Sequence, residues 1–461
     1  MCVEHLLGEV KKEDPSFSWE QGGREPLKQI QQQYLQQRKW KLVKLINHIF
    51  LELDVEGQQE KVSYFPPKLL VEHTNLCNAQ CIMCSHFYTD NFGRGFIEGS
   101  VIRKLEEILP YADKVLLHGI GEPFLHPRIA DYIALYKSYG AEVSCNTNLS
   151  IMDKALAQCI RDSFQEIVVS CDSPVRETFE QIRRKVSFEG FCKNARLLRE
   201  TCPDLHIRMN VVAMRQNLKQ LPDIIPFAEQ LGVDSVAIMD LTAQKLMGNE
   251  WDEIGRYPHT ARYYLEKVQE AAAGSKVRLI SIPQHIFHCS PIGTMEEEQA
   301  QMERYPMFPD AQAQRRLREA YQKLNMVKPL IPATVANVGQ AGKTICQGIC
   351  NNFAETPFLS PTGELFGCCT DGVHVYGNLK EAASFGEIWN GEAYRAVRRN
   401  FYQGKLPRYC NACSFLKGEA MSRLKLVSID ETFYENEFSK LLQGLAEQAE
   451  RGRSRRKGKE K

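Results

Sequence analysis

Three cysteines gather in one short stretch, Cys77-Asn-Ala-Gln-Cys81-Ile-Met-Cys84, with C-x3-C-x2-C spacing. Three thiolates in one loop can bind one inorganic cluster, and thiolates are the usual protein ligands of iron–sulfur clusters. A 4Fe–4S cubane has four irons, so three cysteines leave one iron without a protein ligand. An open coordination position allows a metal centre to do chemistry rather than only hold a fold. The spacing therefore favours a reactive iron–sulfur cluster.

A structural zinc loop and three unrelated core cysteines stay open as alternatives for this stretch. Structural zinc sites usually close with a fourth ligand and prefer paired C-x2-C knuckles. Free cysteines seldom crowd in this way in a reducing compartment. Both alternatives are therefore less favoured than the cluster.

The cysteine content as a whole indicates a reducing compartment. The chain has 461 residues, 16 of them cysteines, and its beginning, Met1-Cys-Val-Glu-His-Leu-Leu-Gly, meets charged residues before any long apolar run. We therefore expect no signal peptide, and no stretch approaches the roughly 18 apolar residues of a membrane span. Many cysteines without secretion favour metal or cluster ligation over disulfides. We expect a cytoplasmic protein.

The elements that must position the first cysteines alternate between strand and helix from about residue 68 to 282. The predicted strands are Leu69–Thr74, Lys114–His118, Glu142–Asn146, Glu166–Cys171, His206–Val212, Ser235–Asp240 and Lys276–Ile282. The predicted helices are Ser100–Leu109, Arg128–Ser138, Ile151–Asp162, Arg176–Ile182, Phe188–Thr201, Leu221–Leu231 and Thr260–Ala273. Such alternation predicts an α/β fold with a parallel sheet, and the number of units suits a full or partial barrel. Chemistry in such barrels gathers at the C-terminal strand ends, where the cysteine loop should lie.

The second predicted strand ends in Leu117-His-Gly-Ile-Gly-Glu-Pro123. Gly119 and Gly121 would let a ligand approach the backbone closely, and Glu122 offers a carboxylate. Because this strand end follows the cysteine loop by one strand–helix unit, both should lie on the same rim of the barrel. A purely structural turn is the alternative.

A second group of cysteines lies in the C-terminal region. Four of them make a plausible site: Cys350, Cys368, Cys410 and Cys413. Phe358–Phe366 contains a Pro/Gly turn and is predicted as a β-hairpin that carries Cys350 and Cys368 to one end. The Cys410–Cys413 pair is a knuckle that both zinc and iron–sulfur sites use. A zinc site, or no metal at all, stays open here.

The chain resembles the radical SAM superfamily. Cys77, Cys81 and Cys84 match its cysteine signature, with Met83 where the family usually has an aromatic residue. His118-Gly-Ile-Gly-Glu122 matches its Gly-Gly-Glu motif with Ile120 inserted. The resemblance implies a partial (β/α)6 TIM-like barrel in which S-adenosylmethionine (SAM) chelates the open iron. It also implies that reductive cleavage of SAM gives a 5′-deoxyadenosyl radical, which abstracts a substrate hydrogen.

Later strand ends offer further positions at which this resemblance implies contacts with SAM. Asn148 follows the third predicted strand, and Ser170 ends the fourth in a Ser-x-Asp pattern. Arg183 resembles the arginine that pairs with the SAM carboxylate, a task that suits its planar fork. Asn210 and Met214 lie near the end of the fifth strand, where the family contacts adenosine, although each could equally be a polar cap or a core residue. No general acid or base can be chosen.

The C-terminal region resembles the SPASM domain, which follows many radical SAM barrels. Cys350, Gly363 and Cys368 fit its Cys…Gly-x4-Cys element, and the cysteine count implies one auxiliary 4Fe–4S cluster held by the four cysteines named above. Cys346 and Cys369 are left as spare thiols or alternative ligands. The resemblance thus implies a small cysteine-rich α+β domain after the barrel.

Five regions are predicted: a helical extension (1–64), the partial barrel (65–283), an insertion or bridging segment (284–345), the auxiliary cluster domain (346–430), and a helix with a disordered basic tail (431–461). Within the first, Lys28–Asp54 is helix-compatible and carries an apolar stripe that should dock on the next domain, with a membrane-surface or peptide-docking helix as the alternative. Helices are expected in the insertion at 296–300 and Ala313–Leu324. The net charge of +1 argues against a polyanionic partner for the whole molecule, and nucleic-acid binding by the tail is not favoured.

The leading hypothesis is a radical SAM enzyme that modifies a peptide or protein side chain, with electron transfer through the auxiliary cluster. A flavodoxin or ferredoxin would be a suitable reductant. One alternative is a radical SAM dehydrogenase of a small polyol or sugar-like molecule. Another is a non-catalytic iron–sulfur or zinc protein, which predicts cysteine sites without cofactor binding.

Overall fold

The computed structural model describes residues 2–19, 23–84, 95–241, 249–289, 293–305, 340–368, 375–407, 410 and 423–428. Three helices begin the chain: α1 (Val3–Glu13), α2 (Arg24–Gln36) and α3 (Trp40–Glu56). The expectation of one helix over Lys28–Asp54 is therefore wrong. The chain turns at Arg38, whose φ is +54°, and the N–H of Lys39 donates to the carbonyl of Tyr34 at 2.9 Å. This hydrogen bond closes a left-handed helix end of the Schellman type.

Helix α3 docks on the barrel, as its apolar stripe predicts. Leu42, Ile46 and Ile49 are buried. The indole N–H of Trp40 donates to the carbonyl of Ser138 at 3.0 Å, and Lys44 Nζ donates to the carbonyl of Gly140 at 2.6 Å. Both carbonyls lie at or just beyond the C-terminal end of helix α6 (Ile129–Ser138), so the basic face of α3 is partly used in contacts within the chain.

Parallel strands follow one another around the barrel in chain order. They are β1 (Lys68–Val71), β3 (Lys114–Leu116), β4 (Glu142–Ser144), β5 (Asn146–Thr147), β6 (Glu166–Ser170), β8 (His206–Ala213), β9 (Ser235–Asp240) and β10 (Arg278–Ser281). Strands β1, β3 and β4 belong to one sheet and β5 to β10 to another, and a parallel bridge from Val143 to Phe164 spans the junction. Among the described strands, β10 pairs only with β9, so the barrel stays open there. The predicted partial barrel is confirmed.

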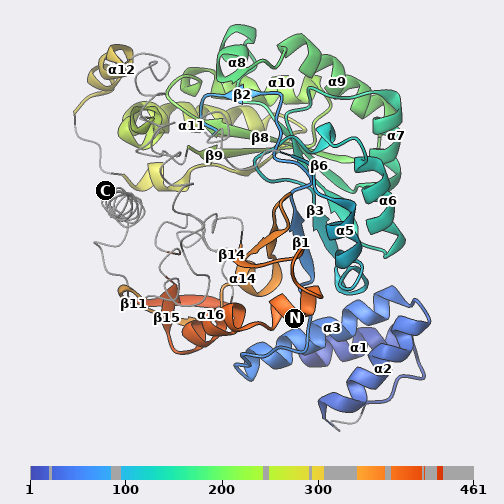
Figure 1. Ribbon diagram of the computed structural model, residues 1–461. Helices are drawn as coiled ribbons and strands as arrows, with labels where there is room; N and C mark the ends of the chain where they lie inside the picture. Colours follow the sequence, from blue (N-terminus) through green and yellow to red (C-terminus); the bar gives the residue numbers. More distant parts are fainter. Residues whose placement is uncertain are drawn as a thin grey trace, which may run out of the picture.

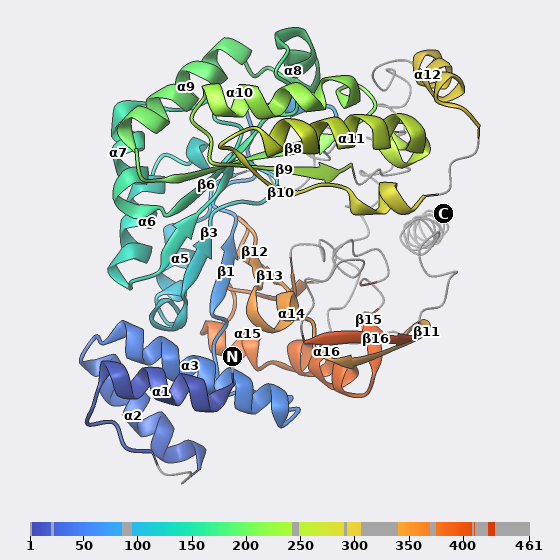
Figure 2. The same cartoon turned by 180° about the vertical axis from the view of Figure 1, so that it is seen from behind.

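Helices cover the outer face of this sheet (Figure 1; seen from behind in Figure 2). They are α5 (Gly99–Leu105), α6 (Ile129–Ser138), α7 (Lys154–Ser163), α8 (Arg176–Ile182), α9 (Phe188–Thr201), α10 (Ile224–Gln230) and α11 (Pro258–Ala273). Helix α7 begins three residues later than expected because Asp153 caps it, accepting a hydrogen bond from the N–H of Leu156 at 2.8 Å. Helix α10 begins later than expected as well, because a 3-10 turn that contains Pro222 precedes it.

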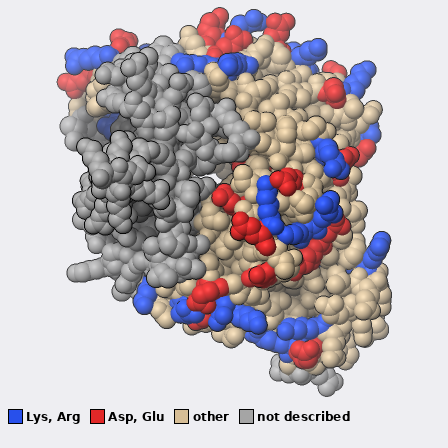
Figure 3. Space-filling model, viewed as in Figure 1, with Lys and Arg blue, Asp and Glu red and all other residues tan. Residues whose placement is uncertain are grey.

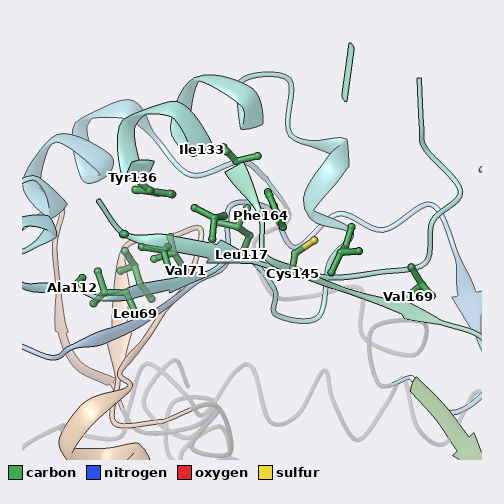
Figure 4. Close-up of a cluster of buried hydrophobic side chains, with 14 of the residues drawn as sticks. Leu69, Val71, Ala112, Leu117, Ile133, Tyr136, Cys145, Phe164 and Val169 are labelled. Atoms are coloured by element: carbon green, nitrogen blue, oxygen red, sulfur yellow. The ribbon is translucent and has the colours of Figure 1, made fainter. Parts of the chain in front are cut away.

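The main core lies between the sheet and these helices. Strand β8 alternates half-exposed and buried residues along its whole length, which is the pattern of a strand with one face against the helices. Figure 4 shows part of this core: Leu69 of β1, Leu117 just beyond β3 and Val169 of β6 belong to the same buried cluster as Ile133 and Tyr136 of α6. Residues on the other face of each strand are therefore available to line the barrel interior.

The C-terminal region extends the barrel sheet. Its elements are β11 (Gln340–Gly348), α14 (Asn351–Glu355), β12 (Phe358–Leu359), β13 (Glu364–Phe366), β14 (Val375–Asn378), α15 (Phe385–Trp389), α16 (Glu392–Tyr402), β15 (Lys405–Pro407) and β16 (Leu424–Ser428). The predicted hairpin is present as β12 and β13. Strand β12 also pairs in parallel with β1, with Leu70 opposite Phe358, a contact that the sequence did not predict.

The insertion is described in part. Helix α12 (Met295–Arg304) matches the expected helix at 296–300 and begins with a capping box between Thr294 and Glu297. The expected helix Ala313–Leu324 and the C-terminal region 431–461 lie outside the described residues. No helix among those described is both long and apolar enough to cross a membrane.

Candidate cofactor and cluster site

The cysteine loop leaves the end of β1 and is fastened to the far side of the barrel. Its short strand β2 (Gln80–Cys81) pairs antiparallel with β7 (Arg183–Arg184), so that Cys81 faces Arg183. The N–H of Ile82 donates to the carbonyl of Ile182 at 3.0 Å. The loop therefore spans the rim of the barrel from its first strand to the end of α8.

Donors from two other elements point at the sulfur atoms. Asn148 Nδ2 donates to Cys77 Sγ at 3.8 Å, and Arg183 Nη1 donates to Cys81 Sγ at 4.0 Å. Burial raises the pKa of the Cys77 thiol to about 11, so a thiolate here needs a bound cation such as iron. The donor set suits an iron–sulfur cluster because hydrogen bonds to the sulfurs and nearby positive charge stabilise its negative charge.

No three His, Cys, Asp or Glu side chains in the described part of the chain surround one point as ligands of a single metal ion. A 4Fe–4S cubane does not require that placement, because each thiolate binds a different iron. Cys77, Cys81 and Cys84 share one loop, and the N–H of Cys84 donates to the carbonyl of Cys81 at 3.1 Å. The cubane is the group that these residues fit.

Gly119 and Gly121 lie against other parts of the chain, where the sequence led us to expect a ligand. A Cβ atom on Gly119 would lie 2.3 Å from Glu72 Oε1, and one on Gly121 would lie 2.1 Å from the carbonyl oxygen of Thr74. Glu72 Oε1 in turn accepts the N–H groups of Ile120 at 2.5 Å and of Gly121 at 3.1 Å. The two glycines thus let this strand end pack against the backbone that leads into the cysteine loop.

Glu72 was not predicted as a site residue. It is buried, and burial raises its pKa to about 7. An acidic residue at the end of an apolar strand is the signal that could have drawn attention to it, because a buried carboxylate requires hydrogen-bond partners.

Glu122 and Asn148 meet beneath Cys77. The Glu122 carboxylate accepts hydrogen bonds from Thr147 Oγ1 at 2.7 Å and from the N–H of Asn148 at 2.8 Å. Burial raises the pKa of Glu122 to about 7. The Asn148 side chain then reaches Cys77 and also donates to Asn78 Oδ1 at 3.0 Å. The structure therefore brings together three of the predicted positions, Cys77, Glu122 and Asn148.

Arg183 lies on the opposite side of the loop, beside Cys81. Its Nε is 2.8 Å from Asp172 Oδ2, and both side chains are buried. Met214 packs with Ile82, Ile182 and Leu241 in a small apolar cluster under the same part of the loop. Ser170 is half-buried at the end of β6, directly opposite Asn210 of β8. Asp172, the partner of Arg183, was not predicted as a site residue.

Polar side chains line the interior face of the strands below this rim. Arg208 of β8 forms an ion pair with Glu166 of β6 at 3.0 Å. His118, just beyond β3, has a pKa of about 4, lowered by burial and by the charges of Arg208 and Lys114. At neutral pH His118 is therefore uncharged and can accept or donate hydrogen bonds.

The auxiliary site is described for three of its four predicted ligands. Cys350 directly precedes α14, Cys368 follows β13, and Cys410 lies beyond β15, and all three are buried. Gly367 lies so close to Phe353 of α14 that a Cβ atom would be 2.8 Å from the ring, so the end of the hairpin lies against that helix. Cys413 and the alternative ligand Cys369 lie outside the described residues.

Cys346 has a different environment. It lies within β11, and its Sγ is 4.0 Å from the carbonyl oxygen of Phe401 in α16. Burial raises the pKa of this thiol to about 11. These contacts are those of a core thiol packed on a helix.

Two family profiles match the chain. Residues 71–228 match the radical SAM superfamily, and residues 350–414 match the iron–sulfur cluster-binding domain called SPASM. The first match contains the cysteine loop and Arg183, and the second contains Cys350, Cys368, Cys410 and Cys413 but not Cys346.

Curated relatives and solved structures give more distant likenesses. The cofactor-modifying protein of the tungsten-containing aldehyde ferredoxin oxidoreductase of Pyrococcus furiosus is 27% identical over 182 residues, 38% of this chain and 51% of that protein. The GTP 3′,8-cyclase of Chlorobaculum tepidum is 26% identical over 169 residues, 36% and 48% of the two chains. The match thus spans about half the length of each relative.

Crystal structures of SuiB from Streptococcus suis share the fold. The form bound to S-adenosylmethionine has a TM-score of 0.51 and 14% identity over 78% of this chain and 73% of SuiB. A second SuiB structure has a TM-score of 0.52 and 13% identity over 86% and 78% of the chains.

Proposed function

We propose that this chain, a radical SAM protein with a C-terminal SPASM domain, cleaves SAM reductively and uses the resulting radical to abstract a hydrogen atom from a substrate. A 4Fe–4S cluster at Cys77, Cys81 and Cys84 would supply the electron and, at its open iron, the binding position for SAM. The observation that carries the proposal is the cysteine loop itself. It lies on the rim of a parallel barrel, with polar side chains from two other elements directed at its sulfurs.

The residues of the chain have separate tasks in this proposal. The three cysteines hold the cluster, while Asn148 and Arg183 donate hydrogen bonds to two of the sulfurs. Glu122, Ser170 and Met214 form the adjoining walls of the SAM site. Glu122 acts in part through the backbone that it holds, because its carboxylate already accepts the N–H of Asn148.

Cys350, Cys368, Cys410 and Cys413 are proposed as the ligands of an auxiliary 4Fe–4S cluster. Four thiolates would occupy all four irons, so the group would supply electron transfer and would offer no open iron to a substrate. It would accept the electron that the substrate gives up when its radical is oxidised. Cys346 is left out of this set because it packs on α16.

A peptide or protein side chain is the proposed substrate. The barrel is open beyond β10, and the apolar side chains of Met239 and Ile280 on its last two strands are 39% and 42% exposed. Exposed apolar side chains at an open edge suit an extended chain that continues outside the barrel. A small-molecule substrate is the second candidate, because one of the curated relatives is by its name a GTP cyclase.

The function is tested by anaerobic reconstitution followed by incubation with SAM and dithionite. The proposal predicts about eight irons per chain, the content of two 4Fe–4S clusters, and release of 5′-deoxyadenosine. Cys81→Ala should abolish the release, while Cys159→Ala, a half-buried thiol on α7, should leave it unchanged. No 5′-deoxyadenosine from the wild type, or an undiminished amount from Cys81→Ala, would contradict the proposal.

Transfer of a hydrogen isotope from the substrate to 5′-deoxyadenosine distinguishes the two substrate classes. A deuterated substrate passes deuterium to 5′-deoxyadenosine, and mass spectrometry detects the label. Transfer from a labelled peptide supports the first candidate, whereas transfer only from a labelled polyol or nucleotide supports the second.

A further inference from the structure

Arg183 is a buried cation held beside a cluster cysteine. The side chains of Arg183 and Asp172 are 8% and 0% exposed, and Arg183 Nη1 is 4.0 Å from Cys81 Sγ. Charge interactions at such a depth are much stronger than at the surface, because the surrounding dielectric constant is low. The Arg183 guanidinium can therefore influence the charge state of a metal cluster that Cys81 binds.

Both ends of this contact are fixed by other parts of the fold. Asp172 Oδ1 accepts the N–H of Val212 at 2.9 Å, and the carbonyl of Asp172 accepts Asn217 Nδ2 at 2.7 Å. On the other side, the pairing of β2 with β7 sets Cys81 directly opposite Arg183. The guanidinium is thus held between a fixed carboxylate and a fixed thiol, and no large side-chain motion is needed to bring it to the sulfur.

We propose that Asp172 and Arg183 form a unit that raises the reduction potential of the cluster held by Cys77, Cys81 and Cys84. A cluster becomes one charge unit more negative when it accepts an electron from an external one-electron reductant. A nearby cation stabilises the reduced form more than the oxidised form, and hydrogen bonds to the sulfurs act in the same direction. Arg183 takes no part in the reaction itself: it acts on the cluster through its charge and its hydrogen bond to Cys81, and Asp172 orients it. The proposal rests on the proposed cluster site, but not on the identity of the substrate.

This assignment differs from the contact that the family resemblance implies for Arg183. An arginine that only binds the SAM carboxylate would change the affinity for SAM and leave the potential of the SAM-free cluster unaltered. An arginine beside Cys81 changes that potential even when no SAM is present. The two roles can therefore be separated by one measurement without cofactor.

The test is a redox titration of the reconstituted full chain without SAM, in which EPR measures the fraction of reduced cluster. The cluster signal that shifts on later addition of SAM identifies the barrel cluster. Arg183→Gln should lower the ratio of reduced to oxidised cluster about tenfold at the wild-type midpoint, a shift of about 59 mV to more negative potential. Arg183→Lys keeps the charge and should restore most of the potential. Arg184→Gln, one residue further along β7, should match the wild type.

A midpoint of Arg183→Gln equal to that of Arg184→Gln would overturn the proposal, even if SAM binding is weakened. A second measurement does not depend on the stability of the glutamine variant. Wild-type protein labelled with ¹⁵N-arginine should show a ¹⁵N coupling to the reduced cluster by pulsed EPR, and Arg183→Lys should lack it. A wild type without this coupling would overturn the proposal as well. Neither experiment requires cleavage of SAM, so failure of the proposed reaction would be seen separately.

Discussion

Steric contact at two glycines links the cysteine loop to the neighbouring strand end. Gly121 lies against the backbone of Thr74 and Asn75, and Gly119 lies against the Glu72 carboxylate, so neither position has room for a side chain. The carboxylate also accepts N–H groups from the same turn. These contacts place the Glu122 turn and the cysteines at a fixed distance from one another, which the proposed SAM site between them would require.

Gly121→Ala should therefore disturb the cluster site. The added Cβ would meet backbone atoms, which cannot yield as a flexible side chain does, so we expect a loss of about 1–3 kcal/mol in the free energy of unfolding. Iron retained after reconstitution should fall as well. Gly8→Ala is the matched control, because nothing lies within 4 Å of its Cβ position. It lies inside α1 and should be stabilising by about 0.5–1 kcal/mol. Equal effects of the two changes would contradict the steric explanation.

His73 makes the fold sensitive to acid. Burial lowers its pKa from 6.5 to about 3, and its Nε2 is 2.7 Å from Tyr136 Oη. Between these two pH values the unfolded chain binds a proton that the native chain does not. The free energy of unfolding should thus fall as the pH drops from 6.5 towards 3, by about 1.4 kcal/mol per unit.

His73→Gln should make this fall shallower, because glutamine keeps a polar partner for Tyr136 without a titrating group. Part of the acid sensitivity should remain, since burial lowers the pKa of His118 as well. Thermal unfolding of the metal-free chain between pH 7 and pH 4.5 measures the effect. His5→Gln, at an exposed position of α1, should follow the wild type. Parallel pH profiles for the wild type and His73→Gln would refute the prediction.

Helix ends show what could and could not be predicted about the elements. The existence and type of the barrel strands and helices could be predicted, because their apolar residues recur with the period of two or of 3.6. The break between α2 and α3 could not, since Arg38 occupies the left-handed position where glycine is the usual signal. The pairing of β12 with β1 could not be predicted either, because it joins residues 70 and 358 through tertiary geometry alone.

Some residues of the candidate site could likewise be predicted from the sequence, and others could not. The cysteines, Glu122 and Asn148 could be found from motif order and strand ends, and the structure brings them together. Glu72 and Asp172 could be noticed as carboxylates at the ends of apolar strands, but nothing near them in the sequence identifies the distant groups with which each one pairs. The pair of Asp172 and Arg183 becomes visible only when β6, β7 and β8 are assembled.

Arg38→Gly should be stabilising by about 0.5 kcal/mol, because glycine adopts a positive φ without steric cost. Lys28→Gly, at an exposed position inside α2, should instead be destabilising by about 1 kcal/mol. Thermal unfolding of both variants measures these opposite signs. A loss of stability in Arg38→Gly as large as that in Lys28→Gly would contradict the described helix end.

The whole molecule is held together by contacts among three distant regions. Arg423, at the start of β16, forms ion pairs with Glu52 of α3 at 2.7 Å and with Glu355 of α14 at 3.0 Å. All three side chains are less than 20% exposed. Trp389 of α15 adds a hydrogen bond to the carbonyl of Tyr64 at 3.0 Å. The N-terminal helices thus fasten the C-terminal region to the barrel.

Basic and acidic side chains are mixed over the described part of one face (Figure 3), as the net charge of +1 leads one to expect.

Arg423→Met should take a shared cation away from two buried carboxylates and lower the free energy of unfolding by about 3–5 kcal/mol. Arg395→Met removes an exposed ion pair with Glu392 and should change it by less than about 0.5 kcal/mol. Denaturant unfolding followed by circular dichroism compares the two. Similar losses would show that the buried contacts do not hold the regions together.

An iron left open for SAM at the cluster of Cys77, Cys81 and Cys84 is the feature on which the proposed chemistry depends most. EPR of the reduced, reconstituted chain before and after addition of SAM tests for it. We predict that SAM changes the spectrum of one cluster and leaves that of the auxiliary cluster unaltered, and that Cys350→Ala does not prevent the change. A spectrum that SAM leaves untouched in a chain with its full iron content would contradict the presence of an open iron.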